Sequence, residues 1–411
     1  MGRPKHDRVW ARTSSSLPPW SLMLESLELS NFRGFPALKL EGLRRFNVVT
    51  GANASGKSAL LEAIFCGARG TPEALLSNGQ WRGVVPGITA APLPVTMPVL
   101  PQNFRSIWDH WFYSGIKGDI SHVMKVEYST NTGGRYSFSC KFGPEQPLAN
   151  AGLIPALGGA SVSVRGSIAP FKINREYSEH GSIQRSSVDV TLDQRGQINV
   201  SAALPPLGPN VFVFSNQNYP ESDNVGWYSH LRETGRATEL VDFIRSTFPF
   251  ITGLELLAIG GSTAIYAGLE SGAVRRLQFV SSGINKIVSI LLACANAGNG
   301  IILIDEVENG LFYDKYQLMW SVLYEFAKKF DFQIFASSHS AECLSKLVPT
   351  IEKNVGDFTL IRTEREGDKC VARHISGASM LAALRRGGDI RGITELMALG
   401  SAGEDLGSET E

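Results

Sequence analysis

The sequence predicts an α/β fold, in which a mixed or largely parallel sheet is covered by helices and interrupted by an antiparallel, β-rich insertion. The apolar run 46–50 leads into a glycine-containing loop at 51–58, and apolar residues at helical spacing follow over 59–65. After residue 280, helix and strand patterns alternate again, and the strand pattern at 301–304 is entirely apolar. Such alternation is typical of parallel strands that helices bury on both faces.

The composition is that of a chain with a large core and no overall charge. Of the 411 residues, 43% are hydrophobic, and 39 Lys and Arg balance 39 Asp and Glu. This balance argues against a histone-like protein, so any contact with nucleic acid needs a local patch. No apolar run approaches the ~18 residues of a membrane span, and we expect no membrane role. Five cysteines without close pairs indicate reduced thiols in a cytoplasmic protein.

Proline usage marks a change of character in the middle of the chain. Fourteen of the twenty prolines lie between residues 71 and 230, which excludes a long coiled coil there. Strand patterns such as 136–141 favour an antiparallel insertion, and the aromatic residues of a helix expected at 104–112 (Trp108, Trp111, Phe112) should belong to the core rather than stack on bases. The predicted division is a disordered arm at 1–22, a head formed by 23–70 and 231–399, the insertion lobe at 71–230, and a disordered acidic tail at 400–411. The alternative for the arm is that translation starts at Met23 rather than at Met1.

The loop at 51–58 has the G-x-x-x-x-G-K-S spacing of a phosphate-binding loop. Its glycines let the backbone curl so that N–H groups point at a phosphate, and the following helix adds positive potential. Lys57 would neutralise the β- and γ-phosphates, and Ser58 would bind Mg²⁺. The competing interpretation is a glycine turn without a ligand. The predicted nucleotide-binding residues of this loop are Gly51, Asn53, Ala54, Ser55, Gly56, Lys57, Ser58 and Ala59.

Two carboxylates follow the apolar strand 301–304 in a Walker B arrangement. Asp305 would bind Mg²⁺ together with Ser58, and Glu306 would orient or deprotonate the water that attacks the γ-phosphate. By itself an Asp-Glu pair at a strand end is more often a solvated turn, and the phosphate loop is what favours function here. His339 follows the next strand pattern, from which it can reach the γ-phosphate across the sheet. The predicted catalytic residues are therefore Glu306, His339 and Lys57.

Taken in this order, the motifs resemble those of the ABC-type ATPases of the RecF, SMC and OLD-like group, which are also described as AAA-family ATPases. The resemblance covers both α/β parts, roughly 24–70 and 235–345. It implies a P-loop NTPase fold of the ABC type, with ATP and Mg²⁺ as cofactors. The segments that carry it are Leu27 to Phe35, the loop at 51–58, Val280 to Gly283, Asp305 to Leu311 and Ser338 to Ser340.

The resemblance also implies that each ATP site is shared between two chains. Ser281 and Gly283 match the signature loop, which in the family contacts the γ-phosphate held by the other protomer. Asn309 matches the D-loop, and His339 matches the switch histidine. Arg33 is a candidate nucleotide contact, and its competing interpretation is an arginine that pins a surface turn. ATP would join two heads, and hydrolysis would release them.

Some features depart from the family pattern. The signature lacks the full Leu-Ser-Gly-Gly-Gln string, which argues against a transporter and for the RecF/OLD branch. Phe312 stands where that branch commonly has a histidine, and we interpret it as a packing change. Gln217 is only a guess for the glutamine that usually joins sheet to insertion. The insertion is too short for SMC-like arms, and the 72 residues after His339 are few for the Toprim nuclease domain of OLD proteins.

The leading hypothesis is a cytosolic, Mg²⁺-dependent ATPase that forms a homodimer or a higher oligomer through its ATP sites. By the resemblance, hydrolysis would be coupled to DNA binding or to the control of a separately encoded effector such as a nuclease, in DNA repair or phage defence. The alternatives are an ATP-binding regulatory scaffold with negligible turnover and the nucleotide-binding subunit of a transporter.

Overall fold

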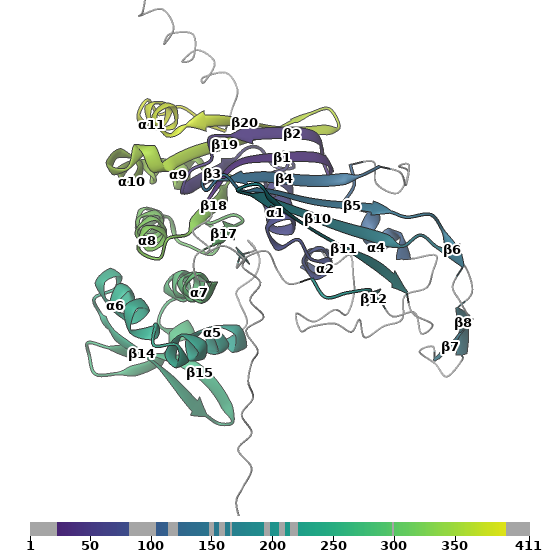
Figure 1. Ribbon diagram of the computed structural model, residues 1–411. Coiled ribbons are helices and arrows are strands. Elements are labelled where there is room, and N and C mark those ends of the chain that lie inside the picture. Colours follow the sequence, from purple (N-terminus) through teal and green to yellow (C-terminus); the bar gives the residue numbers. More distant parts are fainter. Residues whose placement is uncertain are drawn as a thin grey trace, which may run out of the picture.

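The structure contains two large sheets with a helix between them and a smaller three-stranded sheet (Figure 1). It is a computed structural model that describes residues 23–81, 104–113, 122–147, 152–155, 161–164, 167–192, 198–204, 210–213, 221–297 and 300–391. In Figure 1 the larger sheet extends to the right, and a row of helices lines the left side of the molecule.

The six-stranded sheet carries the phosphate loop. Its strands run in the order β13 (Asn210–Val213), β17 (Ile301–Ile304), β18 (Gln333–Ser338), β3 (Phe46–Thr50), β19 (Phe358–Glu366) and β20 (Lys369–Ser376). The pairs from β13 to β19 are parallel, and β20 pairs antiparallel with β19. Every residue of β3, β17 and β18 is buried, which explains the wholly apolar sequence of β17 and the apolar centres of the other two strands. The predicted mixed sheet with covering helices is confirmed.

The seven-stranded sheet is antiparallel throughout. Its strands run in the order β12 (Ile198–Val200), β11 (Ser182–Leu192), β10 (Phe171–Glu179), β5 (Arg135–Phe142), β4 (Met124–Thr130), β1 (Leu24–Phe32) and β2 (Phe35–Glu41). Buried and accessible residues alternate along β4 and β5, so one face packs inward and the other meets solvent.

Strands inside the predicted insertion lobe at 71–230 pair with strands outside it. β4 pairs with β1, so the N-terminal strands and the strands of the insertion form one sheet. β13, which also lies inside 71–230, pairs with β17 of the six-stranded sheet. Without β4, strand β1 would present an edge of unpaired backbone groups, which accounts for the shared sheet. The described strands of this stretch therefore contribute to both large sheets.

Two hydrophobic cores lie on the two faces of the six-stranded sheet. Helix α1 (Lys57–Arg69) lies between this sheet and the seven-stranded sheet, with Leu60 and Val49 in the core that they share. Phe46 and Val48 belong to the opposite core, as the two-residue period of a strand requires. That second core is covered by α7 (Ser282–Ala297), α8 (Tyr316–Lys329), α10 (Val348–Lys353) and α11 (Gly377–Arg385).

A smaller unit packs against α7 and completes the second core. It contains α5 (Glu221–Glu233), α6 (Ala237–Thr247), β14 (Ile251–Ile259), β15 (Ser262–Leu269) and β16 (Val274–Arg276). Gly235, with φ of 74°, separates α5 from α6 in a left-handed turn. The other elements are α2 (Pro72–Trp81), α4 (Ser106–Asp109), α9 (Ala341–Ser345) and two strand pairs, β6 (Gln146–Pro147) with β9 (Ser167–Ile168) and β7 (Gly152–Pro155) with β8 (Ser161–Val164).

The structure confirms several expectations about single residues. Trp108, Trp111 and Phe112 are buried in the core between the two sheets. All five cysteines are buried free thiols. Among the described residues, no helix combines the length and the apolar character needed to cross a membrane.

Two helical glycines test the packing of α1 on the seven-stranded sheet. A Cβ added at Gly67 of α1 would lie 2.6 Å from Cγ1 of Val126 on β4, so Gly67→Ala should push the helix from the sheet and destabilise the protein by about 1–3 kcal/mol. At Gly226 of α5 no atom of the described residues outside the adjoining helix backbone lies within 4 Å of such a Cβ, so Gly226→Ala should stabilise by about 0.5–1 kcal/mol. Urea unfolding followed by circular dichroism measures both, and equal effects would contradict this packing.

Candidate functional site

The site forms where the carboxyl ends of three neighbouring parallel strands meet. β18 lies between β17 and β3, and the phosphate loop follows β3 directly. Asp305 and Glu306 follow β17, and His339 follows β18. The topology thus brings together residues that are about 250 to 290 positions apart in the sequence.

Left-handed backbone at the glycines shapes the phosphate loop. Gly51 has φ of 148° and Gly56 has φ of 102°, values that L side chains rarely adopt. A Cβ at Gly51 would also overlap the carbonyl oxygen of Thr363 on β19, so the loop packs closely against this strand. The Ser55 and Thr363 hydroxyls are hydrogen-bonded at 2.6 Å. Asn53 and Ala54 are exposed at the tip of the loop, where a nucleotide could reach their N–H groups.

Lys57 is folded over the loop. Its ammonium donates to the carbonyl oxygens of Gly51 and Ala52, both at 2.9 Å, and the residue is only 7% exposed. Burial lowers the pKa of Lys57, while the nearby carboxylates of Asp305, Glu306 and Glu308 act in the opposite direction. The lysine is therefore held among acidic groups at the position from which it can meet phosphate.

Asp305 joins the loop to the two central strands. Its Oδ2 accepts a hydrogen bond from the Ser58 hydroxyl at 2.6 Å, and its Oδ1 accepts one from the Ser337 hydroxyl at 2.5 Å. Ser337 in turn accepts a bond from the Glu306 N–H at 2.7 Å. Glu306 has φ of 47°, a strained conformation for a non-glycine residue that these contacts hold in place.

The oxygen atoms of Ser58 and Asp305 fit Mg²⁺. Mg²⁺ prefers hard oxygen ligands and usually takes one or two carboxylates, with phosphate and water supplying the rest. The described residues hold no cluster of three or more His, Cys, Asp and Glu that could bind a metal without such help. One carboxylate beside one hydroxyl, at the start of a phosphate-loop helix, is the donor set of a metal held jointly with a nucleotide.

The structure places His339 beside two carboxylates. Its Nδ1 lies 3.9 Å from Oε1 of Glu306 and 3.2 Å from Oε1 of Glu308. The His339 and Glu306 side chains are 47% and 34% exposed, so both can meet a ligand and solvent. Glu308 is 7% exposed and is a support within the protein rather than part of the accessible surface.

Ser281, Gly283 and Asn309 lie around the start of α7. A Cβ added at Gly283 would lie 3.3 Å from Cδ2 of Leu311, so the signature segment contacts the D-loop of its own chain. The Asn309 N–H donates to the Glu306 carbonyl at 2.9 Å, which ties the D-loop to the Walker B turn. Among the described residues, no hydrogen bond or ion pair joins Ser281 or Gly283 to the phosphate loop.

The contacts of Arg33 are those of an arginine that pins a turn. It forms an ion pair with Glu62 of α1, and its guanidinium lies 4.3 Å from the centre of the Trp111 ring. Arg33 itself has φ of 47°, in the turn between β1 and β2. These contacts pin the turn to the helix that follows the phosphate loop, and a role in nucleotide contact stays a prediction.

Two further expectations have different outcomes. Phe312 was interpreted as a packing change, but its ring is 71% exposed and lies against Tyr313, which is 52% exposed. Packing inside the chain therefore does not explain Phe312. Gln217 lies outside the described residues.

Sequence reasoning did not find the supporting residues Ser337, Glu308, Lys286 and Thr363. Ser337 and Glu308 stand within or beside the recognised motifs, but nothing in their spacing shows that their side chains turn toward Asp305 and His339. Lys286 belongs to the helical pattern after the signature, and its burial at 8% exposure was the missing signal. Thr363 comes from β19, whose position beside β3 could not be inferred from the chain.

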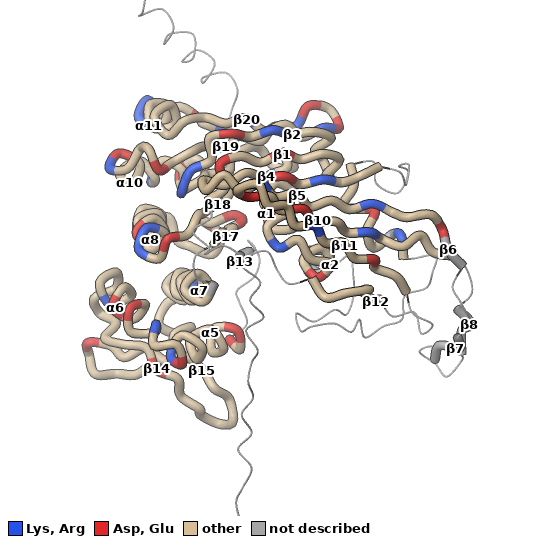
Figure 2. Tube along the Cα trace, in the orientation of Figure 1, with Lys and Arg blue, Asp and Glu red and all other residues tan. Residues whose placement is uncertain are grey.

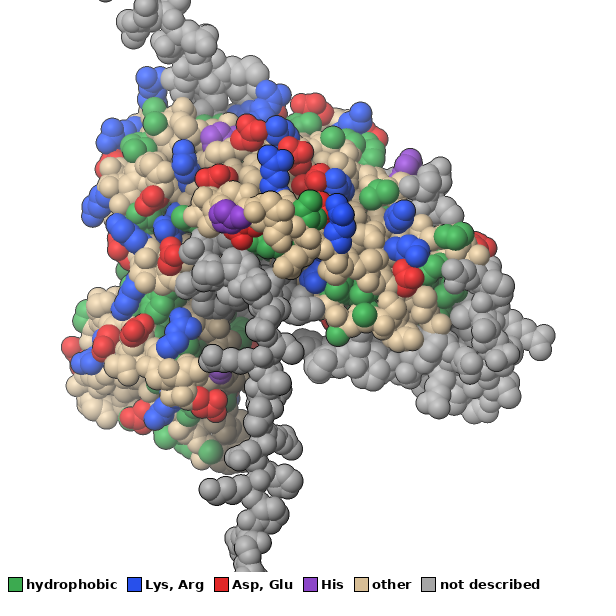
Figure 3. Space-filling view, viewed as in Figure 1, with side chains coloured by type: hydrophobic (Ala, Val, Ile, Leu, Met, Phe, Trp, Pro, Cys, Tyr) green, Lys and Arg blue, Asp and Glu red, His purple; other side chains and the backbone are tan. Residues whose placement is uncertain are grey.

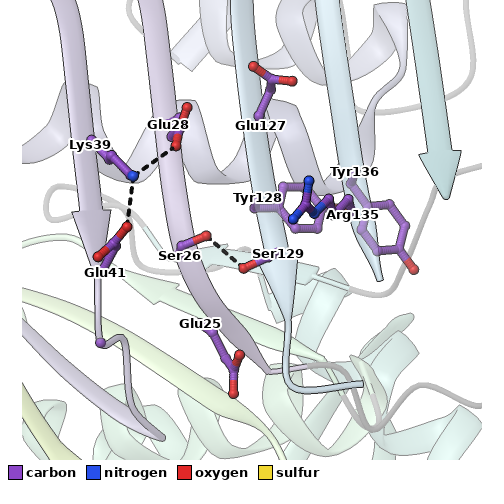
Figure 4. A pocket seen from close by; sticks show the side chains of 11 residues that line it. Glu25, Ser26, Glu28, Lys39, Glu41, Glu127, Tyr128, Ser129, Arg135 and Tyr136 are labelled. Atoms are coloured by element: carbon purple, nitrogen blue, oxygen red, sulfur yellow. Dashed lines mark hydrogen bonds and ion pairs between the residues drawn. The ribbon is translucent and has the colours of Figure 1, made fainter. Parts of the chain in front are cut away.

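A hollow of about 520 Å³ lies away from this site, on the outer face of the seven-stranded sheet over β1, β2, β4 and β5 (Figure 4). Lys39 in this hollow lies 2.8 Å from Glu41 and 3.7 Å from Glu28, between the two carboxylates. Lys, Arg, Asp and Glu are interspersed along the strands of this sheet (Figure 2). The hollow therefore offers no excess of positive charge that would favour a phosphate backbone.

Comparison with known proteins agrees with this geometry. Residues 26–200 match the family model of an AAA domain. The chain is similar to an ATP/GTP phosphatase of Helicobacter pylori, with 22% identity over 367 residues that cover 85% of this chain and 94% of that protein. It is similar over 44 residues, at 46% identity, to the DNA replication and repair protein RecF of Idiomarina loihiensis, covering 11% of this chain and 12% of RecF. Among solved structures, the SMC head domain from Thermotoga maritima is similar at 13% identity and a TM-score of 0.40, with 86% of this chain and 99% of that chain covered.

The matched segment 26–200 contains the phosphate loop at 51–58 and, apart from the first two residues of β1, all strands of the seven-stranded sheet. Asp305, Glu306 and His339 lie beyond that segment, and the parallel sheet brings them to the loop. The chain is thus similar in sequence to an AAA domain and, around its phosphate loop, to RecF, which agrees with the resemblance that the motifs indicate.

Proposed function

We propose that the chain is a cytoplasmic, Mg²⁺-dependent ATP hydrolase, and that the heads of two copies join when ATP binds. The observation that carries the proposal is the position of Asp305, whose carboxylate accepts hydrogen bonds from Ser58 and Ser337 at once. A glycine turn without a ligand gives no reason to bury a carboxylate against the hydroxyl that begins the helix. The name of the Helicobacter pylori relative, an ATP/GTP phosphatase, supports the same activity.

Each side chain of the site would have a separate task. Ser58 and Asp305 would hold Mg²⁺, which neutralises charge on the phosphate oxygens. Lys57 would exchange its bonds to loop carbonyls for bonds to the β- and γ-phosphates. Glu306 would accept a proton from water as the water oxygen bonds to the γ-phosphorus and the bond from that phosphorus to the β-γ bridging oxygen breaks. His339 would stabilise the charge that develops on the γ-phosphate oxygens.

The signature segment supports a shared site. Ser281 and Gly283 begin a long helix, whose N-terminus favours an anion. Gly283 lies toward Leu311 on the D-loop side, and the hydrogen bonds of Ser281 go to Ile284 and Asn285 of α7. We propose that these residues meet the γ-phosphate bound to a second copy, so that ATP holds a homodimer or a higher oligomer together. Asn309 would lie at the same junction.

Coupling of hydrolysis to DNA or to an effector is the second part of the proposal. The likeness to RecF, whose name states DNA replication and repair, supports a DNA contact. On the face shown in Figure 3, described side chains of both charges alternate, so a DNA contact would be a patch that forms when heads join. Control of a separately encoded nuclease, in DNA repair or phage defence, is the other form that this coupling could take.

Glu306→Gln tests the hydrolytic role. The amide keeps the shape of the side chain but cannot accept the proton of the attacking water, so turnover should fall at least about 100-fold while ATP binding is retained. Release of phosphate measures turnover, and analytical ultracentrifugation with ATP should show a trapped dimer. Glu325→Gln, which removes an exposed carboxylate from α8, is the matched control and should behave as the unchanged protein.

Normal turnover in Glu306→Gln would contradict the Walker B assignment. If the unchanged protein shows no turnover above background, with and without DNA, while ATP still raises its melting temperature, the ATP-binding scaffold replaces the hydrolase. Copurification that depends on membrane proteins would favour a transporter subunit.

Mixing two inactive variants tests whether sites are shared. Lys57→Met disables the phosphate loop, and Ser281→Arg blocks the signature, so each variant alone should be inactive. In a mixed dimer one of the two sites combines an intact loop with an intact signature, so an equal mixture should recover about a quarter of the normal rate. If mass photometry shows mixed dimers and no rate returns, the sites are not shared in this way.

A further inference from the structure

Glu308 is a buried carboxylate at the edge of the site to which the sequence motifs assign no role. It lies three positions after Asp305 and is 7% exposed. Burying a carboxylate is costly unless its oxygens receive hydrogen bonds and a countercharge lies near. The arrangement of these partners therefore shows what the side chain does.

One oxygen of Glu308 holds the turn that carries His339. Oε1 accepts hydrogen bonds from the backbone N–H groups of His339 at 3.0 Å and Ser340 at 3.2 Å. The same Oε1 lies 3.2 Å from Nδ1 of the His339 ring. One oxygen thus contacts both the backbone and the ring of a single histidine.

This contact determines how the ring is presented. A proton on Nδ1 is required for a hydrogen bond to a carboxylate, which leaves Nε2 at the opposite edge of the ring. Because the ring is 47% exposed, that edge is accessible to a ligand. A carboxylate that fixes the tautomer and orientation of a histidine in this way is common where the histidine has a chemical task.

Lys286 supplies the countercharge. It is 8% exposed, and its ammonium donates to the carbonyl oxygen of Asn309 in the D-loop. Burial lowers the pKa of Lys286 to about 8, and attraction by Glu308 and Glu306 opposes that effect. Because Lys286 belongs to α7, the partners of Glu308 extend from the switch histidine to the signature helix.

We infer that Glu308 is the positioning residue of His339, whose ring it orients through Nδ1 so that Nε2 is presented to the γ-phosphate of ATP. The inference rests on the proposed function of the site, because it assumes the role proposed for His339. Glu308 contacts the histidine and the Ser340 N–H but not the reacting atoms, and we therefore assign its effect on hydrolysis to His339.

A double-mutant cycle in phosphate release tests this dependence. Glu308→Ala should lower kcat about 10- to 100-fold and leave the KM for ATP within about threefold, because ground-state binding does not use the oriented ring. His339→Ala should lower kcat at least as much. In the His339→Ala background, Glu308→Ala should cause no further loss, since there is no ring left to orient. Losses that multiply, or a raised KM with unchanged kcat, would overturn the inference.

Two further variants separate positioning from a general effect on folding or charge. Glu308→Gln can still accept the two backbone N–H bonds, but its neutral oxygen holds the Nδ1 proton less strongly, so its kcat should lie between those of the unchanged protein and Glu308→Ala. Glu342→Gln removes an exposed carboxylate from the first turn of α9, one turn beyond His339, and should leave kcat unchanged. Equal loss in Glu342→Gln would show a nonspecific effect of charge and contradict the assignment.

A spectroscopic measurement decides the inference without relying on turnover. In protein labelled with ¹⁵N in histidine, the signals of His339 are those that disappear in His339→Gln. We expect a protonated Nδ1 for His339 in the unchanged protein and in Glu342→Gln, and a shift toward the Nε2-protonated form in Glu308→Gln. The same His339 spectrum in Glu308→Gln would overturn the inference, whereas absence of ATP turnover in the unchanged protein would overturn only the proposed function.

Discussion

The site depends on the two hydrogen bonds that Asp305 accepts from Ser58 and Ser337. These bonds connect the start of α1, the end of β17 and the end of β18, which have no covalent connection nearby. The carboxylate is 7% exposed, and a hydroxyl donor to each oxygen satisfies it in this buried place. The Glu306 N–H bond to Ser337 extends the same cluster, so the conformation of the proposed base depends on it. Loss of this one carboxylate would separate three elements at once.

Sequence predicted the parts of the site that adjacent residues form. The phosphate loop can be recognised because its task needs glycines, a lysine and a hydroxyl at consecutive positions, and Asp305 and Glu306 because both follow one strand. Glu308, Lys286 and Ser337 could not be assigned in the same way, because their importance comes from which side chains face one another after folding. Arg33 shows this limit as well, since its motif allowed either a nucleotide contact or a pinned turn, and only the structure shows its ion pair with Glu62.

The fold was predictable to a similar degree. Apolar runs at 46–50 and 301–304 indicate buried parallel strands, because both faces of such strands need cover. Proline density argues against a coiled coil, but it does not show which strand β4 pairs with. Strand β1 is separated from β4 by almost a hundred residues, and alternating patterns on both strands fit many partners. The shared seven-stranded sheet could therefore be found only from the structure.

Four charged residues in and beside the site are buried, and their two positive charges balance their two negative charges. Lys57 and Lys286 are positive, Asp305 and Glu308 are negative, and each is at most 8% exposed. Each lysine is attracted by the carboxylates around it, which offsets the cost of burial. The accessible groups are Glu306 and His339, to which we assign proton transfer and phosphate contact. A nucleotide and Mg²⁺ would bring further charge to Lys57 and Asp305, and binding would therefore change the electrostatic attraction among all four residues. Through Lys286 this change can reach the signature helix, and through Glu308 it can reach the switch histidine.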